Sequence, residues 1–293
     1  MTANQKPPPP TNRGVEKYIS TCIDWVSATF RRGVEVQYHD KLSKRKTEFK
    51  PFNAYNTAVR YDDGRIELSH TTRKEMGVHV IASGDCLRKM PISAQDYVLF
   101  LIGAGATITR IDISMDVKGS TLSVARARCE VKNGRAKTRS REFPFWDDSA
   151  KTGGQTQYIG KKSSTVFTRI YDKAREMGME GYKWTRVETV FQAEKAHRAA
   201  IVASSGLDLR DLIRGHIDFP QWKKWQKCMS ETAYRVKSEI KETNTQKWLL
   251  NTCAPALARE IHLSGDDDFY WKFIDSVKVK LEELRELHDN KET

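Results

Sequence analysis

The chain has 293 residues, of which 39% are hydrophobic and 30% charged, and its formal net charge at pH 7 is +12. This length is enough for one large domain or two smaller ones with a buried core. Apolar runs such as Tyr97 to Ala104 are too short to span a bilayer, and the proline-rich start lacks the apolar stretch of a signal peptide. We therefore expect a cytoplasmic protein with no membrane contact.

The positive net charge favours salt-dependent association with polyanions such as nucleic acids. The cysteines are odd in number and widely scattered, and none has the close spacing of a zinc or redox motif. We expect them to be free thiols: Cys22, Cys86, Cys129, Cys228 and Cys253.

In chain order, the first predicted elements are β-strands. Residues 1–14 hold four consecutive prolines and are predicted to be a disordered tail. Tyr18 to Phe30 alternates apolar and polar residues, which is typical of a strand. Residues 33–80 predict several short strands, with a turn at Asp62–Asp63–Gly64. Val78 to Ala82 is another strand-like run, and Ser83 is predicted to cap a helix that continues to Arg88.

The middle of the chain contains the most regular pattern. Thr107 to Val117 is the clearest alternating strand, and a basic stretch follows from Ala125 to Arg141. Beyond Gly153–Gly154, strands are predicted at Gln155 to Gly160, Thr165 to Lys173 and Trp184 to Phe191. From Gln192 onward the pattern is helical, with interruptions at Gly206, Gly215 and Pro220 and an amphipathic helix from Phe269 to His288.

Strands followed by helices favour an α+β fold. We predict a β-rich core followed by a helical C-terminal region. The predicted division is a disordered tail (1–14), a β-rich domain (15–191) and a helical region for DNA binding or dimerisation (192–293).

The strand at Thr107 to Val117 carries an unusual polar face. Residues two apart in a strand share a face, which here holds Arg110, Asp112, Ser114 and Asp116. Because strands disfavour aspartate, this pattern indicates a carboxylate face that binds Mg²⁺ or Mn²⁺. The alternative is a solvated face with an Arg–Asp pair.

The strand at Thr165 to Lys173 places a tyrosine between cations, since Phe167, Arg169, Tyr171 and Lys173 share a face. Flanking cations favour phenolate over phenol and attract a phosphate group, and tyrosine can act as a covalent nucleophile. The alternative is that Tyr171 only packs and that the cations are surface charge.

The strand at Trp184 to Phe191 adds Arg186 and Glu188 on one face. Glu188 could complete a carboxylate set with Asp112 and Asp116. The alternative is a cross-strand ion pair worth at most about 1 kcal/mol.

Together these segments resemble a known family. The order RIDISMD, YIGKKSS, TRIYDKAREMG and WTRVETVF, preceded by IDWVSATF and GVHVIASGDCLRKM, is similar to the replication initiation factors of rolling-circle plasmids, integrative elements and filamentous phages. The resemblance covers about residues 18–195. It implies a catalytic core built on a curved, mostly antiparallel β-sheet with flanking helices. It also implies that Tyr171 is the nicking nucleophile and that a divalent metal, Mg²⁺ or Mn²⁺, is bound by Asp112, Asp116 and Glu188.

The resemblance also implies a mechanism. Tyr171 attacks a phosphodiester and leaves a 5′-phosphotyrosine and a free 3′-OH, while Arg169 and Lys173 neutralise the phosphate. DNA contacts are expected at Arg110, Lys161, Lys162 and Arg186, and the basic stretch 125–141 adds backbone contacts unless it is a solvated loop. Implied partners are origin DNA (single-stranded or hairpin), a host helicase and a second copy of the chain.

Three other functions remain open. A conjugative relaxase would use the same chemistry, whereas a DNA-binding regulator would not need Tyr171. A nuclease that uses water is less well supported, because Glu188 is followed by Thr189 and Val190 and not by the Glu-x-Lys pattern. The His–hydrophobic–His metal motif of many rolling-circle enzymes is missing, since only His79 stands in its place, and we expect His79 to be structural.

Overall fold

The computed structural model describes residues 18–30, 46–119, 122–148, 154–179 and 181–237. The predicted tail (1–14), the predicted helix at Phe269 to His288 and Cys253 lie outside these residues. The other four cysteines are free thiols, as predicted. Among the described residues, no helix has the length and apolarity needed to cross a membrane.

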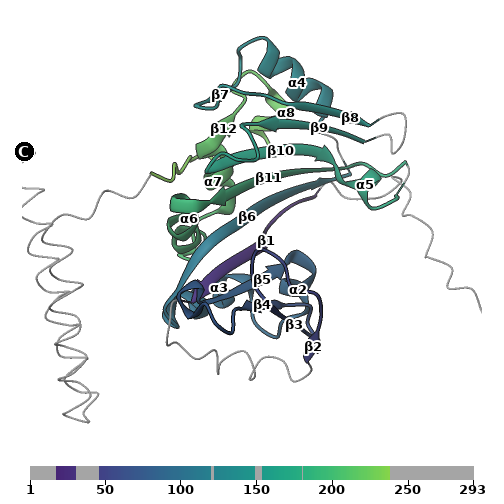
Figure 1. Ribbon diagram of the computed structural model, residues 1–293. Helices are drawn as coiled ribbons and strands as arrows, with labels where there is room; N and C mark the ends of the chain where they lie inside the picture. The colour runs from purple at the N-terminus through teal and green to yellow at the C-terminus, as the bar shows by residue number, and fades with distance from the viewer. Residues whose placement is uncertain (1–17, 31–45, 120–121, 149–153, 180, 238–293) are drawn as a thin grey trace, which may run out of the picture. The chain divides into compact units, whose positions relative to one another are not determined.

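An antiparallel sheet of ten strands organises the described chain (Figure 1). Its order is β2-β3-β4-β5-β1-β6-β11-β10-β9-β8, and β7 pairs separately with β12. The strands are β1 Tyr18–Phe30, β2 Lys46–Glu48, β3 Thr57–Tyr61, β4 Ile66–Ser69, β5 Val78–Ser83, β6 Ala106–Lys118, β7 Lys137–Thr138, β8 Phe145–Asp148, β9 Gly154–Ile159, β10 Val166–Asp172, β11 Trp184–Gln192 and β12 Ile217–Asp218.

Helices lie between and after these strands. They are α2 Gly84–Lys89, α3 Ala94–Gly103, α4 Val124–Lys132, α5 Lys173–Glu176, α6 Ala196–Ala203, α7 Leu209–His216 and α8 Lys223–Gln226, with short 3₁₀ turns η1 Lys74–Met76 and η2 Ala193–Lys195. The predicted α+β fold, with a curved antiparallel sheet and flanking helices, is thereby confirmed.

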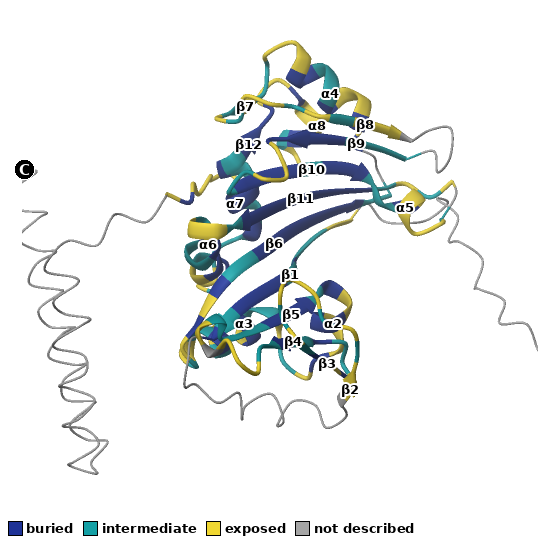
Figure 2. Ribbon diagram, viewed as in Figure 1, coloured by how far each residue is buried: buried dark blue, intermediate teal, exposed yellow. Residues whose placement is uncertain are grey.

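The hydrophobic core lies between the sheet and helices α3, α4, α6 and α7. Ile111, Ile113 and Met115 of β6 are fully buried in it, because alternation sends every second side chain of the strand to this side. Figure 2 shows that the central strands β6, β10 and β11 are buried along most of their length. A strand with one face in the core and a second polar face therefore forms the middle of the sheet.

Helices α6 and α7 come from the region predicted to be separate, 192–293. Their apolar residues, among them Ala199, Leu212 and Ile213, pack in the same core as the sheet. The first part of the helical region thus contributes to the fold that holds the strands. The domain boundary after residue 191 stays a prediction, because residues from 238 onward are outside the described chain.

Most predicted strands are confirmed, and so is the cap at Ser83, whose hydroxyl accepts a hydrogen bond from the Cys86 amide. Two predictions were wrong in detail. Lys173 begins helix α5, because the Asp172 side chain caps that helix through the Arg175 amide. Gly215 does not interrupt a helix but lies inside α7.

Candidate functional site

A polar face runs across the neighbouring strands from β8 to β1, on the side of the sheet opposite the hydrophobic core. Residues paired directly across antiparallel strands share a face, so the register places the side chains in rows. The first row runs through Trp146, Thr156, Tyr171, Arg186, Asp116 and Ser20. The second contains Tyr158, Arg169, Glu188, Ser114 and Cys22, and the third contains Phe167, Val190, Asp112 and Trp25. We call this surface the polar face.

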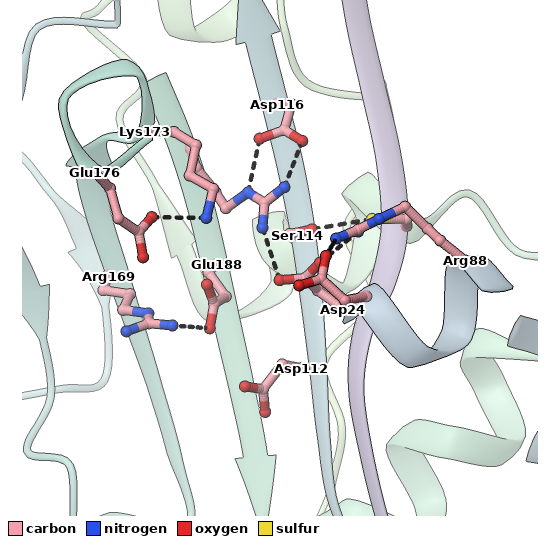
Figure 3. A network of polar contacts seen from close by, with 12 residues as sticks. Asp24, Arg88, Asp112, Ser114, Asp116, Arg169, Lys173, Glu176 and Glu188 are labelled. Carbon is pink, nitrogen blue, oxygen red and sulfur yellow. Dashed lines mark hydrogen bonds and ion pairs between the residues drawn. The ribbon is translucent and has the colours of Figure 1, made fainter. Parts of the chain in front are cut away.

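Arg186 lies at the centre of the polar face and forms ion pairs with two carboxylates, Asp116 and Asp24. Both aspartates are labelled in Figure 3. Its Nε and Nη2 donate to the two oxygens of Asp116, both at 2.7 Å, and its Nη1 lies 2.6 Å from Asp24. Asp116 also accepts a hydrogen bond from the Trp184 indole at 2.7 Å. Because both oxygens of Asp116 accept from protein donors, its charge is satisfied within the sheet.

Asp112 forms a second bidentate pair, with Arg110 on the same strand. The Nε and Nη2 of Arg110 donate to the carboxylate at 2.8 and 2.6 Å. Burial raises the pKa of Asp112 to about 7; Arg110 opposes this shift and the nearby charge of Glu188 adds to it. Asp112 is therefore a buried carboxylate that a further positive charge would stabilise.

Glu188 links the tyrosine to a cation. Its Oε1 lies 2.6 Å from Nη2 of Arg169, and its Oε2 accepts a hydrogen bond from the Tyr171 hydroxyl at 3.2 Å. The Nε of Arg169 is buried and makes no hydrogen bond among the described residues. This nitrogen is thus a buried donor without a hydrogen-bond acceptor among those residues.

The Tyr171 hydroxyl is protonated in this setting, contrary to the sequence prediction that its neighbours favour phenolate. Burial raises the pKa of Tyr171, and Glu188 raises it further, while Arg169 lowers it by less. The prediction was wrong because it placed two free cations beside the ring. Arg169 is instead bonded to Glu188, and Lys173 forms an ion pair with Glu176 at 2.6 Å.

Lys173 nevertheless stays near the tyrosine. Its Nζ lies 5.9 Å from the centre of the Tyr171 ring, although the residue belongs to helix α5 and not to the strand. Lys173 therefore lies near Tyr171 on the polar face, as strand alternation predicted, although it belongs to the first turn of α5.

The sequence reasoning missed Asp24, which belongs to the same network. A shift in the pairing of β1 with β6 between Ile23 and Trp25 leaves Asp24 as an extra residue, and its carboxylate meets Arg186 and Arg88. A side chain at Gly84 would come within 2.2 Å of the Asp24 carboxylate, so the glycine makes room for it. Burial raises the pKa of Asp24, Arg186 lowers it, and Glu188 raises it.

The predicted metal set of Asp112, Asp116 and Glu188 does not converge. Asp112 and Asp116 are four residues apart on one strand, a separation of about 13 Å. In the part of the chain that the structure describes, no three His, Cys, Asp or Glu side chains are arranged to hold a metal ion. Asp24, Asp112 and Glu188 (Figure 3) are instead each paired with a guanidinium group, of Arg186, Arg110 and Arg169 in turn, and the charge of Glu188 raises the pKa of both aspartates.

A cavity of about 390 Å³ opens beside Tyr171, between β8, β9, β10 and α5. Trp146, which is 64% exposed, and Tyr158 line it together with Arg169. Lys162 extends toward the same aromatic rings, with its Nζ 6.0 Å from the Trp146 ring and 5.2 Å from the Tyr158 ring. Lys161 instead pairs with Glu142 at 2.8 Å.

Comparison with known proteins gives three findings. A family model described as "Replication initiation factor" matches residues 106–269, more than half of the chain. The chain is 24% identical over 308 residues to the "Putative DNA relaxase NicK" of Bacillus subtilis (strain 168), with 86% of each chain covered. It also resembles a solved structure, the rolling circle replication initiator protein from Geobacillus stearothermophilus, with a TM-score of 0.62 and 19% identity over 76% of this chain and 100% of that chain. The last likeness shows a shared fold.

The Arg186 network generates a stability prediction. Replacing Arg186 by Met leaves Asp116 and Asp24 buried without their shared cation, which typically costs about 3–5 kcal/mol. We expect a loss of that order in the free energy of unfolding, measured by urea denaturation. The matched control is Arg88→Met, which also removes a partner of Asp24 but from a side chain that is 58% exposed, and it should cost no more than about 1 kcal/mol. Equal losses in the two variants would contradict the account.

Proposed function

Since the chain belongs to the replication initiation factor family, we propose that it nicks and rejoins one strand of origin DNA through Tyr171, with residues 15–191 as the nicking domain. The observation that carries this proposal is the position of the Tyr171 hydroxyl. The tyrosine lines a cavity, and among the described residues its hydroxyl bonds only to Glu188. Cations lie close to its ring, and the adjoining strands supply the carboxylates.

The reaction we propose is a transesterification. The phenolic oxygen of Tyr171 attacks the phosphorus, its proton passes to Glu188, and a new O–P bond forms. The bond from phosphorus to the 3′ oxygen breaks, and that oxygen leaves with the bonding electron pair and takes up a proton. The products are a 5′-phosphotyrosine and a 3′-OH. Because one phosphodiester replaces another, a 3′-OH can reverse the step and reseal the strand without ATP.

The protonation of Tyr171 explains why the site needs additional positive charge. Tyr171 has a raised pKa, and the Glu188 carboxylate beside it opposes the formation of a phenolate. Arg169 faces both groups, and its partly exposed guanidinium could contact a phosphate oxygen. A divalent ion would supply that charge and polarise the phosphate, but to bind Glu188, Asp112 or Asp24 it would have to displace the guanidinium group that each one holds in this structure. We do not assign this role to Asp116, which lies about 13 Å from Asp112 along β6.

The cavity beside Tyr171 is suited to a single DNA strand. Exposed aromatic rings stack on unpaired bases, and a nearby lysine can contact the backbone between them. Trp146 stands in the same row as Tyr171, and Lys162 lies near the rings of both Trp146 and Tyr158. We propose that a base next to the scissile phosphate stacks on Trp146. The strand must therefore be unpaired at the nick.

A second function is conjugative relaxation, which the 24% identity to the putative relaxase favours. It would use the same nucleophile and would give the same covalent adduct. The two functions differ in the step after the nick: extension of the 3′-OH by a polymerase, or transfer of the strand to another cell. A plasmid that carries the nick site would replicate in the first case and be mobilised in the second.

The central prediction concerns Tyr171→Phe. The substitution removes only the attacking oxygen and one hydrogen bond of 3.2 Å, so the fold should persist. We expect adduct formation on labelled single-stranded oligonucleotides from the replicon, with Mg²⁺ or Mn²⁺, to fall at least about a thousandfold on denaturing gels. EDTA should abolish the adduct of the unaltered protein.

The matched control for that experiment is Tyr158→Phe, which alters a ring of the same cavity on the neighbouring strand. It should retain the adduct. Cleavage by the unaltered protein without any adduct would point instead to hydrolysis by water, and DNA binding without cleavage would favour a regulator.

The stacking role of Trp146 has its own test. Loss of one base–aromatic stack typically costs about 1–3 kcal/mol, so Trp146→Ala should weaken binding of a single-stranded oligonucleotide by roughly 5-fold to 100-fold. Trp146→Phe should restore most of the affinity, and neither variant should change the rate of adduct formation at saturating DNA. An unchanged Kd for Trp146→Ala, measured by fluorescence anisotropy, would remove Trp146 from the DNA path.

A further inference from the structure

A second cavity, of about 520 Å³, lies away from Tyr171 and on the helix side of the sheet. It is bounded by the loop after β7, the start of β10, and the end of α7. Val166 and Phe191, which line it, belong to the hydrophobic core and point away from the polar face. Along β10, Val166 and Tyr171 are separated by about 17 Å. We call this space the basic cavity.

The lining of the basic cavity is strongly cationic. Its charged residues are Arg139, Arg141, Lys195, Arg235 and Lys237, and no acidic residue lines it among those the structure describes. Within the same described residues, none of these five side chains forms an ion pair with a carboxylate. This contrasts with the polar face, where Arg110, Arg169 and Arg186 are each paired. Cations that converge without counter-charges create a positive potential that attracts anions.

Specific backbone packing holds Arg235 at the basic cavity. A side chain at Gly215 would come within 1.9 Å of the Tyr234 carbonyl oxygen, so a glycine inside α7 allows residues 234–235 to lie against the helix. The Tyr234 amide then donates to the Asp211 carbonyl at 2.8 Å, and the Arg235 Nε donates to the Gly215 carbonyl at 3.1 Å. Glycine within a helix costs about 1 kcal/mol relative to alanine. The close approach of Arg235 explains why α7 contains one.

His216 lines the basic cavity as a neutral side chain. Its pKa is lowered to about 4, mainly by burial, with smaller contributions from Lys195 and Arg235 and an opposing hydrogen bond to the Ile159 carbonyl. The imidazole is therefore neutral at pH 7 and offers a hydrogen-bonding group beside the cations. The hydroxyls of Ser140, Ser164 and Thr165 line the same space. Arginine, lysine and hydroxyl groups together are the set that contacts phosphate oxygens.

We propose that the basic cavity binds backbone phosphates of the origin DNA at a place distinct from the nick. The inference rests on the proposed function only in that the protein binds DNA; it does not depend on the chemistry of Tyr171. Because several cations line a space of this size, more than one phosphate is accommodated. Phosphate contacts fix position without reading sequence, so the basic cavity anchors the DNA while Tyr171 acts on the unpaired strand.

The test compares two double variants by the salt dependence of DNA binding. Log Kobs falls as log salt rises, and each lost phosphate contact makes this slope shallower by about 0.9 for duplex DNA. Arg139→Gln with Arg141→Gln should therefore reduce the magnitude of the slope for origin DNA by up to about 1.8. Adduct formation on a short oligonucleotide that spans only the nick should not change.

The matched control is Lys223→Gln with Lys224→Gln, which removes the same formal charge from exposed residues of α8 outside the cavity. Its slope should match that of the unaltered protein. The inference is overturned if the arginine variant also matches. A second outcome would also overturn it. If tripolyphosphate raises the stability of the unaltered protein but not that of the arginine variant, and the two proteins have equal slopes for DNA, the ligand of the cavity is a free polyphosphate and not DNA. Failure of the unaltered protein to bind DNA would instead contradict the proposed function.

Discussion

Four carboxylates on the polar face, Asp24, Asp112, Asp116 and Glu188, are held inside the sheet by pairing with guanidinium groups. Buried charges are costly unless they are paired and hydrogen-bonded. Arg110 compensates Asp112 within β6, whereas Arg169 of β10 and Arg186 of β11 pair with carboxylates of neighbouring strands. These cross-strand pairs join strands that the hydrophobic core joins from the other side. A charged surface of this kind can exist at the middle of a sheet only while the register is kept.

The same pairing divides the site into parts with different roles. Asp116 and Arg186 satisfy each other and fix the sheet, whereas Glu188 repels both Asp112 and Asp24, and a bound cation would relieve that repulsion. Tyr171 lines the cavity that also contains Trp146. Its raised pKa keeps the hydroxyl protonated for as long as the negative charge of Glu188 is beside it. In our proposal, the basic cavity on the helix side, whose cations form no ion pairs with carboxylates of the described residues, anchors the DNA. The strand is cut on the polar face, where the arginines are paired with carboxylates.

Strands with one apolar face and one charged face could be predicted from the sequence. In Thr107–Val117, isoleucines alternate with charged residues, so both the strand and its polar face could be predicted. The pair of Arg110 and Asp112 on this strand could also be foreseen, but the partner of Asp116 could not, because its pairing with Arg186 depends on the register between distant strands. Asp24 reaches the polar face through an irregularity in β1 that strict alternation does not predict. The helix Val124–Lys132 escaped notice because its many cations obscure the few apolar positions that pack.

The most direct test of the account is to identify the amino acid that becomes linked to DNA. The adduct formed with a short single-stranded oligonucleotide would be digested with nuclease and trypsin and analysed by tandem mass spectrometry. Cleavage after Arg169 and after Lys173 isolates Tyr171 in the peptide Ile170–Lys173. Our account predicts a nucleotide on that tyrosine. A nucleotide on another residue, such as Tyr158 or Tyr182, would contradict it.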